Sequence, residues 1–211
     1  MKKTRVSFLS GELSLEGIVA IPEGTGRSPA IIICHPHPLY GGSMDNNVVC
    51  GLSETLTQAS FASFKFNFRG VLGSQGEFGQ GIGEQEDVKA AISFIITLKE
   101  VDSQRIGLVG YSAGAGFALP VGSSHGRIKA LAAASPPLNM FNFQFLKRSP
   151  KPKLLISGSR DDFTAADEFL GFCQTLAEPK QCEIVEGADH FWWEYESHLA
   201  AKVTAFFLEI L

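Results

Sequence analysis

The sequence predicts an α/β protein whose central sheet is mostly parallel and is covered by helices on both faces. Short apolar, β-branched runs such as Ala30–Cys34 alternate with segments of helical period such as Asn46–Ala59. Strands that alternate with helices of this length need crossover connections, and these bring the strands into a parallel sheet. The exception is an antiparallel hairpin at the start of the chain, predicted from Val6–Leu9 and Leu13–Ile21 and closed by Pro22–Gly24.

The remaining elements follow in order from the same periodicity. Further strands are predicted at Ala30–Cys34, Phe61–Phe68, Arg105–Val109, Ile128–Ala134, Leu154–Ser157 and Cys182–Val185. Helices are predicted at Asn46–Ala59, Gly83–Leu98, Ala113–Val121 and Thr164–Ala177, and a final amphipathic helix is marked by Leu199, Val203, Phe206, Phe207 and Ile210. Thr164 and Asp167 have the spacing of a capping box at a helix start. Because no linker or repeat interrupts the pattern, residues 1–211 are expected to form one domain.

Composition limits the partners of the protein. Of its 211 residues 45% are apolar and 19% are charged, and the net charge is −4 without any block of Lys or Arg. A nucleic-acid partner is therefore not expected, and no apolar run reaches the roughly 20 residues of a membrane span. Cys34, Cys50, Cys173 and Cys182 form no C-x-x-C pair, so we expect reduced thiols and a cytoplasmic location. A small-molecule partner is expected, and a homo-oligomer is left open.

A serine is the predicted nucleophile. Gly110–Gly114 has the pattern G-x-S-x-G, follows a buried strand and precedes a helix, so the sharp turn between them would expose Ser112 above the sheet. Small residues two positions before and after the serine relieve crowding in such a turn. Gly122–Gly126 also matches the pattern around Ser124, but it follows a helix, so we expect a surface loop there.

A serine nucleophile needs a base that is held by a third group. His190 follows the last predicted strand and belongs at the catalytic edge, whereas His198 lies inside the final helix. The acid is expected after the preceding strand, where Asp161 and Asp162 are adjacent. We choose Asp161, because Asp162 lies closer to the next helix start, where a carboxylate has a structural role. Asp189 is the weaker alternative, since it directly precedes the base.

A histidine-rich turn, His35–Gly42, ends the first long buried strand. One interpretation is a metal site in which His35 and His37 are joined by Cys34 or Asp45. No second ligand cluster is present, so we expect no metal. Asn67–Gly70, after the next strand, either shapes the floor of the site or forms a salt-bridged turn.

His35–Gly42, Gly110–Gly114 and Gly187–His190 together resemble the α/β-hydrolase superfamily, over essentially the whole chain. More narrowly, they resemble small lidless serine hydrolases related to dienelactone hydrolases. The resemblance implies a triad in the chain order Ser, Asp, His, and the hydrolysis of carboxylic esters or thioesters without a cofactor. Two departures are visible: Ser112 replaces the cysteine nucleophile of dienelactone hydrolase itself, and Ser135–Lys153 is too short for a helical lid.

The resemblance also implies an oxyanion hole made of backbone N–H groups. One is donated by the residue after the nucleophile, here Ala113, and the other by the histidine-rich turn. Proline has no N–H, which leaves His37 or Leu39 in that turn. His37 is preferred, because it aligns with the donor of many relatives.

Aromatic residues are the candidate substrate contacts. Phe141 and Phe143 lie in a segment where Phe alternates with polar residues, and Phe191 follows the base. They form an aromatic wall or pack against the sheet, and without a lid the site should be an open cleft for short acyl groups. The sequence thus predicts a serine hydrolase for small esters or thioesters that works through an acyl-enzyme. The alternatives are a binding protein that kept the fold without the chemistry, and a small peptidase.

Overall fold

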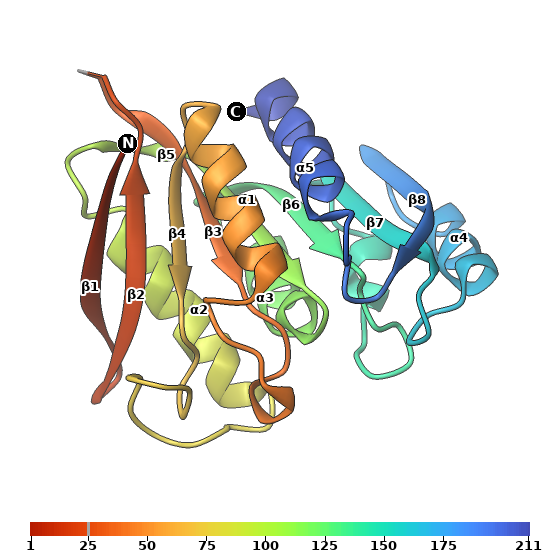
Figure 1. Ribbon diagram of the computed structural model, residues 1–211, viewed down its shortest axis with the longest axis horizontal. Helices are drawn as coiled ribbons and strands as arrows, with labels where there is room; N and C mark the ends of the chain where they lie inside the picture. The colour runs from red at the N-terminus through yellow and green to blue at the C-terminus, as the bar shows by residue number, and fades with distance from the viewer. Residues whose placement is uncertain (25) are drawn as a thin grey trace.

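The computed structural model describes residues 1–24 and 26–211, which build one eight-stranded sheet (Figure 1). The strands are β1 (Lys2–Ser10), β2 (Leu13–Ile21), β3 (Ser28–Cys34), β4 (Ala62–Phe66), β5 (Val101–Tyr111), β6 (Ile128–Ala134), β7 (Lys153–Arg160) and β8 (Lys180–Asp189). Their order across the sheet is β1-β2-β4-β3-β5-β6-β7-β8. β2 pairs antiparallel with both β1 and β4, and every other pair is parallel. The predicted fold class is confirmed.

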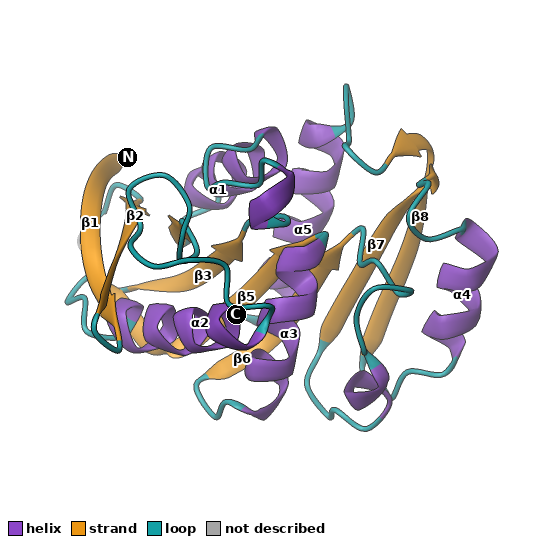
Figure 2. Ribbon diagram, turned by 90° about the horizontal axis from the view of Figure 1, so that it is seen from below, coloured by secondary structure: helices purple, strands orange, loops and turns teal. Residues whose placement is uncertain are grey.

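Helices cover both faces of the sheet (Figure 2). They are α1 (Asn47–Gln58), α2 (Ile82–Ile95), α3 (Ala113–Ser124), α4 (Ala166–Gln174) and α5 (Glu196–Ile210), with short 3-10 turns η1 (Pro38–Tyr40) and η2 (Gln144–Lys147). The apolar side chains of α1 and α5 join one buried cluster, and those of α2, α3 and α4 join a second cluster on the opposite face.

Strand β3 illustrates why the sequence requires two layers of helices. Ile31 and Ile33 belong to the cluster under α1 and α5, whereas Ile32 belongs to the cluster under α2 and α3. All three side chains are fully buried. Since successive side chains of a strand point to opposite faces, a continuous apolar run can be buried only when both faces are covered.

Several predicted boundaries differ from the structure; β5, for example, begins at Val101 rather than Arg105, and β8 spans Lys180–Asp189 rather than Cys182–Val185. Two of the differences have a clear physical reason. β1 begins at Lys2 rather than Val6, because this edge strand is held by its ladder with β2 and its polar first residues stay exposed. α4 begins at Ala166 without a side-chain cap, so the predicted capping box at Thr164 does not form. The Thr164 hydroxyl instead donates to the Pro136 carbonyl at 3.0 Å and accepts the Leu138 N–H at 3.0 Å. These bonds tie the loop after β6 to the loop after β7.

The predicted absence of a helical lid agrees with the structure. Residues 135–152 connect β6 to β7, and η2 is their only helical turn. The carboxyl ends of the parallel strands are therefore left without a cap domain. Within the described part of the chain, no helix combines the length and apolar character that crossing a membrane requires.

Candidate active site

Ser112 lies at the sharp turn between β5 and α3. Its backbone has φ 53° and ψ −127°, a left-handed φ that is strained for a residue with a side chain. Gly110 and Gly114 make this turn feasible. A Cβ on Gly110 would lie 2.4 Å from the backbone of Ala115, and one on Gly114 would lie 2.4 Å from the carbonyl oxygens of β3 and His35. The two glycines of the motif are thus required by the close approach of backbone on each side.

Three predicted side chains form one chain of hydrogen bonds. Ser112 Oγ lies 2.9 Å from His190 Nε2, and His190 Nδ1 lies 2.9 and 3.0 Å from the two carboxylate oxygens of Asp161. All three residues are buried, with 9% or less of each exposed. They come from the ends of β5, β7 and β8, which a parallel sheet brings to the same edge.

The turn after β7 orients Asp161. Its Oδ1 accepts the N–H groups of Phe163 and Thr164, at 2.9 and 3.3 Å, and its Oδ2 accepts the Ser157 hydroxyl at 3.1 Å. Burial would raise the pKa of this carboxyl, but the hydrogen bond and the charge of His190 hold it below its usual range. Asp162 is exposed, and α4 begins without a side-chain cap, so the helix-start role that the sequence suggested for Asp162 is not filled.

His190 is held by groups around its ring and its backbone. The Tyr111 hydroxyl donates to the His190 carbonyl oxygen at 2.9 Å, and burial with the nearby Asp161 charge raises the pKa of this phenol, which keeps its proton. The Phe163 ring lies on the imidazole with its centroid 4.1 Å away, and Phe191 meets it edge-on at 5.5 Å. Sequence reasoning missed Tyr111, because only the folded chain brings the residue before the nucleophile to the backbone of the base.

The turn after β3 offers backbone donors. The Leu39 N–H donates to His37 Nδ1 at 3.2 Å, whereas the N–H groups of His37 and Ala113 have no acceptor among the described residues. Both residues line the same pocket as Ser112. The turn requires a glycine at position 42, since a Cβ there would lie 2.1 Å from the Pro36 carbonyl oxygen. The geometry therefore favours His37 over Leu39 as a donor toward the serine.

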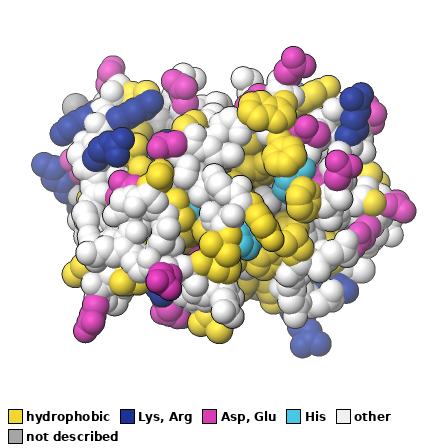
Figure 3. Space-filling model, turned by 60° about the horizontal axis from the view of Figure 1, so that its bottom comes forward, with side chains coloured by type: hydrophobic (Ala, Val, Ile, Leu, Met, Phe, Trp, Pro, Cys, Tyr) yellow, Lys and Arg dark blue, Asp and Glu magenta, His cyan; other side chains and the backbone are white. Residues whose placement is uncertain are grey.

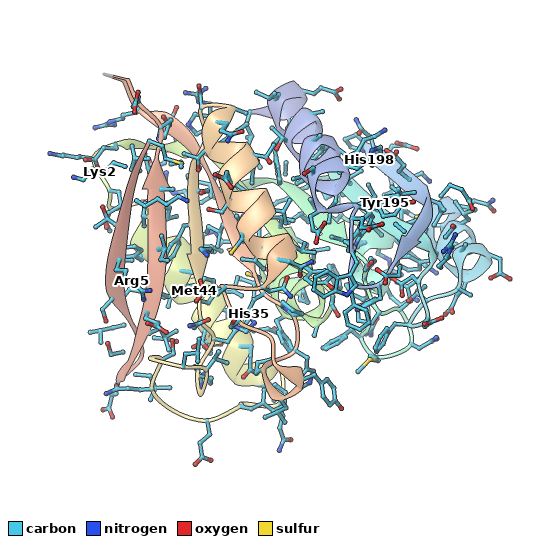
Figure 4. All side chains as sticks on the ribbon, viewed as in Figure 1. Lys2, Arg5, His35, Met44, Tyr195 and His198 are labelled. Carbon is cyan, nitrogen blue, oxygen red and sulfur yellow. The ribbon has the colours of Figure 1, made fainter. Side chains whose placement is uncertain are left out.

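His35 has a structural position. Its Nδ1–H donates to the Pro36 carbonyl at 2.7 Å and its Nε2 accepts the Phe68 N–H at 3.0 Å, so both ring nitrogens bind backbone. Burial lowers its pKa to about 4. In Figure 4, His35 lies at the carboxyl end of β3, and the exposed His198 lies on α5 away from that edge. Nowhere in the described residues do three or more His, Cys, Asp or Glu side chains form a group suited to a metal ion.

A pocket of about 200 Å³ opens above Ser112. Its lining residues are Pro36, His37, Tyr40, Gly41, Gly42, Asn46, Tyr111, Ser112, Ala113, Pro137, Met140, Phe163, His190 and Phe191. Phe191 was predicted, but Phe141 and Phe143 do not line this pocket. Phe143 is buried in the core, and Phe141 lies against Gly116 of α3, whose missing side chain leaves room for the ring. Pro137 and Met140 of the same loop take their place.

The other candidate segments have structural roles. Arg69 donates to Asp87 from its guanidinium at 2.7 Å and from its backbone N–H at 3.0 Å, so Asn67–Gly70 is the salt-bridged turn of the two predicted alternatives. None of its residues lines the pocket. Ser124 ends α3 rather than lying in a loop, and its hydroxyl donates to the Val121 carbonyl at 3.1 Å.

Comparisons with known proteins agree with the fold. An uncharacterized protein of Rickettsia prowazekii is 33% identical over 174 residues, which are 79% of this chain and 73% of the relative. The structure of an alpha-beta serine hydrolase homologue from Coxiella burnetii is 30% identical, with a TM-score of 0.88 over 97% of each chain. A lidless serine hydrolase of Xanthomonas campestris, 24% identical, shares the fold with a TM-score of 0.86 over 99% of this chain and 94% of its own.

The model of one protein family matches residues 80–205 of this chain. The matched range contains Ser112, Asp161 and His190. This chain belongs to the dienelactone hydrolase family, a family of hydrolases with the α/β fold described above.

Proposed function

We propose that this protein is a serine hydrolase that cleaves small carboxylic esters or thioesters through an acyl-enzyme. The observation that carries the proposal is the continuous hydrogen-bonded chain from Ser112 through His190 to Asp161, at the base of an open pocket. A serine hydroxyl becomes an effective nucleophile when such a base accepts its proton. Membership of a hydrolase family supports the same conclusion.

In the acylation half of the proposed reaction, Ser112 Oγ attacks the substrate carbonyl carbon while its proton moves to His190 Nε2. The carbonyl oxygen becomes an oxyanion, which the N–H groups of His37 and Ala113 stabilise at the N-terminal end of α3. Asp161 stabilises the imidazolium. The tetrahedral intermediate then collapses, and His190 gives its proton to the departing alcohol or thiol, which leaves the acyl group on Ser112.

Deacylation repeats these steps with water. His190 Nε2 takes a proton from a water molecule, whose oxygen attacks the acyl carbonyl, and the oxyanion again occupies the two backbone donors. Collapse of this second intermediate breaks the bond to Ser112 Oγ, which recovers its proton from His190. The products are one carboxylic acid and one alcohol or thiol, and no other reactant is consumed.

Covalent labelling with a fluorophosphonate tests the nucleophile. Wild-type protein should be labelled and Ser112→Ala should not, because only an activated serine attacks the phosphorus atom. Ser124→Ala is the matched control, since it removes the serine of the second G-x-S-x-G match and should be labelled like wild type. An unlabelled wild-type protein, beside a control hydrolase that is labelled, would contradict the proposal and favour a non-catalytic binding protein.

The size of the pocket indicates short acyl groups. A volume of about 200 Å³ encloses only a few methylene groups beyond the reacting carbonyl. Each buried methylene contributes about 0.8 kcal/mol, and methylenes beyond the pocket contribute little. On p-nitrophenyl esters, kcat/KM should therefore peak at acyl chains of about two to six carbons. A steady rise to twelve carbons or more would contradict an open, short pocket.

We also place this activity in the cytoplasm. All four cysteines are free thiols, as in proteins of reducing compartments. Fractionation of cells should recover the protein with cytosolic marker enzymes.

A further inference from the structure

The pocket above Ser112 is free of fixed charge. None of the fourteen described residues that line it is Lys, Arg, Asp or Glu. Arg69 does not line the pocket, and its guanidinium is held in an ion pair with Asp87. A substrate carboxylate in the pocket would therefore lose part of its hydration without gaining a cationic partner, and such a loss is costly.

The polar groups of the pocket are neutral as well. The side-chain oxygen of Asn46 accepts the Val48 N–H at 3.0 Å, so Asn46 caps α1. Its amide group has no charge. Partial burial lowers the pKa of His37, an effect that the Glu84 charge partly offsets, so this imidazole is neutral near pH 7. The free N–H groups of His37 and Ala113 are committed to the oxyanion during the proposed reaction.

Two carboxylates close to the pocket repel anions. The Asp161 carboxylate lies behind His190, 2.9 Å from its Nδ1, and the pKa of this carboxyl is lowered as described above. Glu84 is buried at the start of α2, where it accepts the N–H groups of Gly79 and Gly81, close enough for its charge to act on His37. The whole chain has a net charge of −4, which adds a weak repulsion at long range.

The mouth of the pocket is apolar. Four of its lining side chains are large and well exposed: Tyr40 at 78%, Phe191 at 52%, Met140 at 50% and Phe163 at 42%. Figure 3 shows this face, where histidine side chains lie within an apolar surface and the basic side chains lie toward the outline of the molecule. Exposed apolar groups gathered around a hollow are typical of a surface that binds apolar ligand groups.

We propose that this site selects uncharged esters and rejects those that carry a carboxylate within a few bonds of the scissile carbonyl. The inference rests on the proposed function and specifies its substrate class. The acyl group enters the uncharged pocket, and an apolar leaving group lies between Phe163 and Phe191, which flank the histidine that protonates it.

A pair of esters of one acid provides the test. Diethyl succinate and monoethyl succinate share their acyl skeleton and leaving group, and differ in whether the distal group is an ester or a carboxylate. Ethanol release should give a kcat/KM per ester bond that is about 30-fold or more higher for the diester, because of lost hydration and repulsion by Asp161. Equal values, or a preference for the monoester, would overturn the inference.

Met140 allows the charge to be changed without touching the reacting groups. Met140→Arg places a cation at the exposed edge of the pocket and should raise kcat/KM for the monoester, so that the ratio falls to about 10 or less. Met140→Gln is the matched control of similar length without charge, and should keep the wild-type ratio. High salt should weaken the effect of Met140→Arg, because added ions screen exposed charges.

The two proposals fail in different ways. Loss of hydrolysis of both esters in wild-type protein, or equal hydrolysis by Ser112→Ala, would contradict the proposed function. Hydrolysis of both esters at similar rates, with full dependence on Ser112, would leave the proposed function standing and overturn the charge selection alone. The wild-type ratio decides the inference even when a Met140 variant does not fold.

Discussion

His35 and His190 are two buried histidines at the same edge of one sheet, and they have different partners. His35 follows β3, and its ring nitrogens bind the Pro36 carbonyl and the Phe68 N–H, both of which are backbone groups. His190 follows β8, and its ring nitrogens bind the side chains of Ser112 and Asp161. Their exposed fractions, 0% and 5%, are nearly equal. Burial therefore does not distinguish them, and their partners do.

The partners determine what each imidazole can do. A backbone carbonyl and a backbone N–H cannot exchange protons with the ring near neutral pH, so they hold His35 in one neutral tautomer. The Asp161 carboxylate stabilises a positive charge on His190, and the Ser112 hydroxyl has a proton to give. One histidine is thus suited to hold two turns together, and the other is suited to transfer protons.

The largest expected effect comes from removing the charge behind His190. Asp161→Asn should lower kcat by about 10⁴-fold, the loss typical of this change in a Ser-His-Asp triad, because an amide holds the wrong imidazole tautomer against the serine. Steady-state kinetics on a short p-nitrophenyl ester would measure it. Asp162→Asn is the matched control and should keep kcat within about twofold, because Asp162 is exposed and does not line the pocket. Loss of activity in Asp162→Asn instead would reverse the assignment.

His35 should matter for stability rather than for proton transfer. His35→Ala should lower the free energy of unfolding by about 4 kcal/mol, because it leaves a cavity and an unsatisfied Phe68 N–H in the core. Urea denaturation followed by circular dichroism would measure the change. His190→Ala should lose activity even where the variant protein is folded, because the base itself is removed. A stable, inactive His35→Ala protein would contradict the distinction between the two histidines.

The position of the candidate site at one edge of the sheet was predictable, because that position follows from the alternation of strands and helices along the chain. Once Ser112, Asp161 and His190 each follow a strand of a parallel sheet, the topology brings them to one edge. The path of a loop is set by contacts between distant residues instead. Phe141 turns inward because Gly116 leaves space for its ring, and Thr164 binds the loop after β6 rather than capping α4. Periodicity along the chain contains no signal for either contact.

The burial of His35 should also make the stability of the protein depend on pH. Burial lowers the pKa of His35 to about 4, whereas in the unfolded chain it titrates near 6.5. Below the unfolded pKa, the unfolded chain binds a proton that the folded protein refuses, so stability falls as the pH drops toward 4. This residue should account for a loss of about 2 to 3 kcal/mol between pH 7.5 and pH 4.5.

Urea denaturation at both pH values would measure that loss in wild type and in His35→Ala. The variant lacks the titrating ring, so its unfolding free energy should fall by about 2 to 3 kcal/mol less than that of wild type over the same interval. Parallel pH profiles in the two proteins would show that His35 is protonated equally in the folded and unfolded states.

The smallest expected effect concerns the backbone of His190. Tyr111→Phe keeps the buried ring and removes only the hydroxyl that donates to the His190 carbonyl at 2.9 Å. The base would then be less well aligned with Ser112, so kcat should fall by about 10-fold while KM changes by less than about twofold. Thr57→Val is the matched control, because it also removes a buried hydroxyl, one that donates to the Ser53 carbonyl at 2.7 Å far from the site. Both variants should lose about 1 kcal/mol of stability, and only Tyr111→Phe should lose activity. Equal kcat in Tyr111→Phe and wild type would show that the other contacts of His190, with Asp161 and Phe163, are enough to align it.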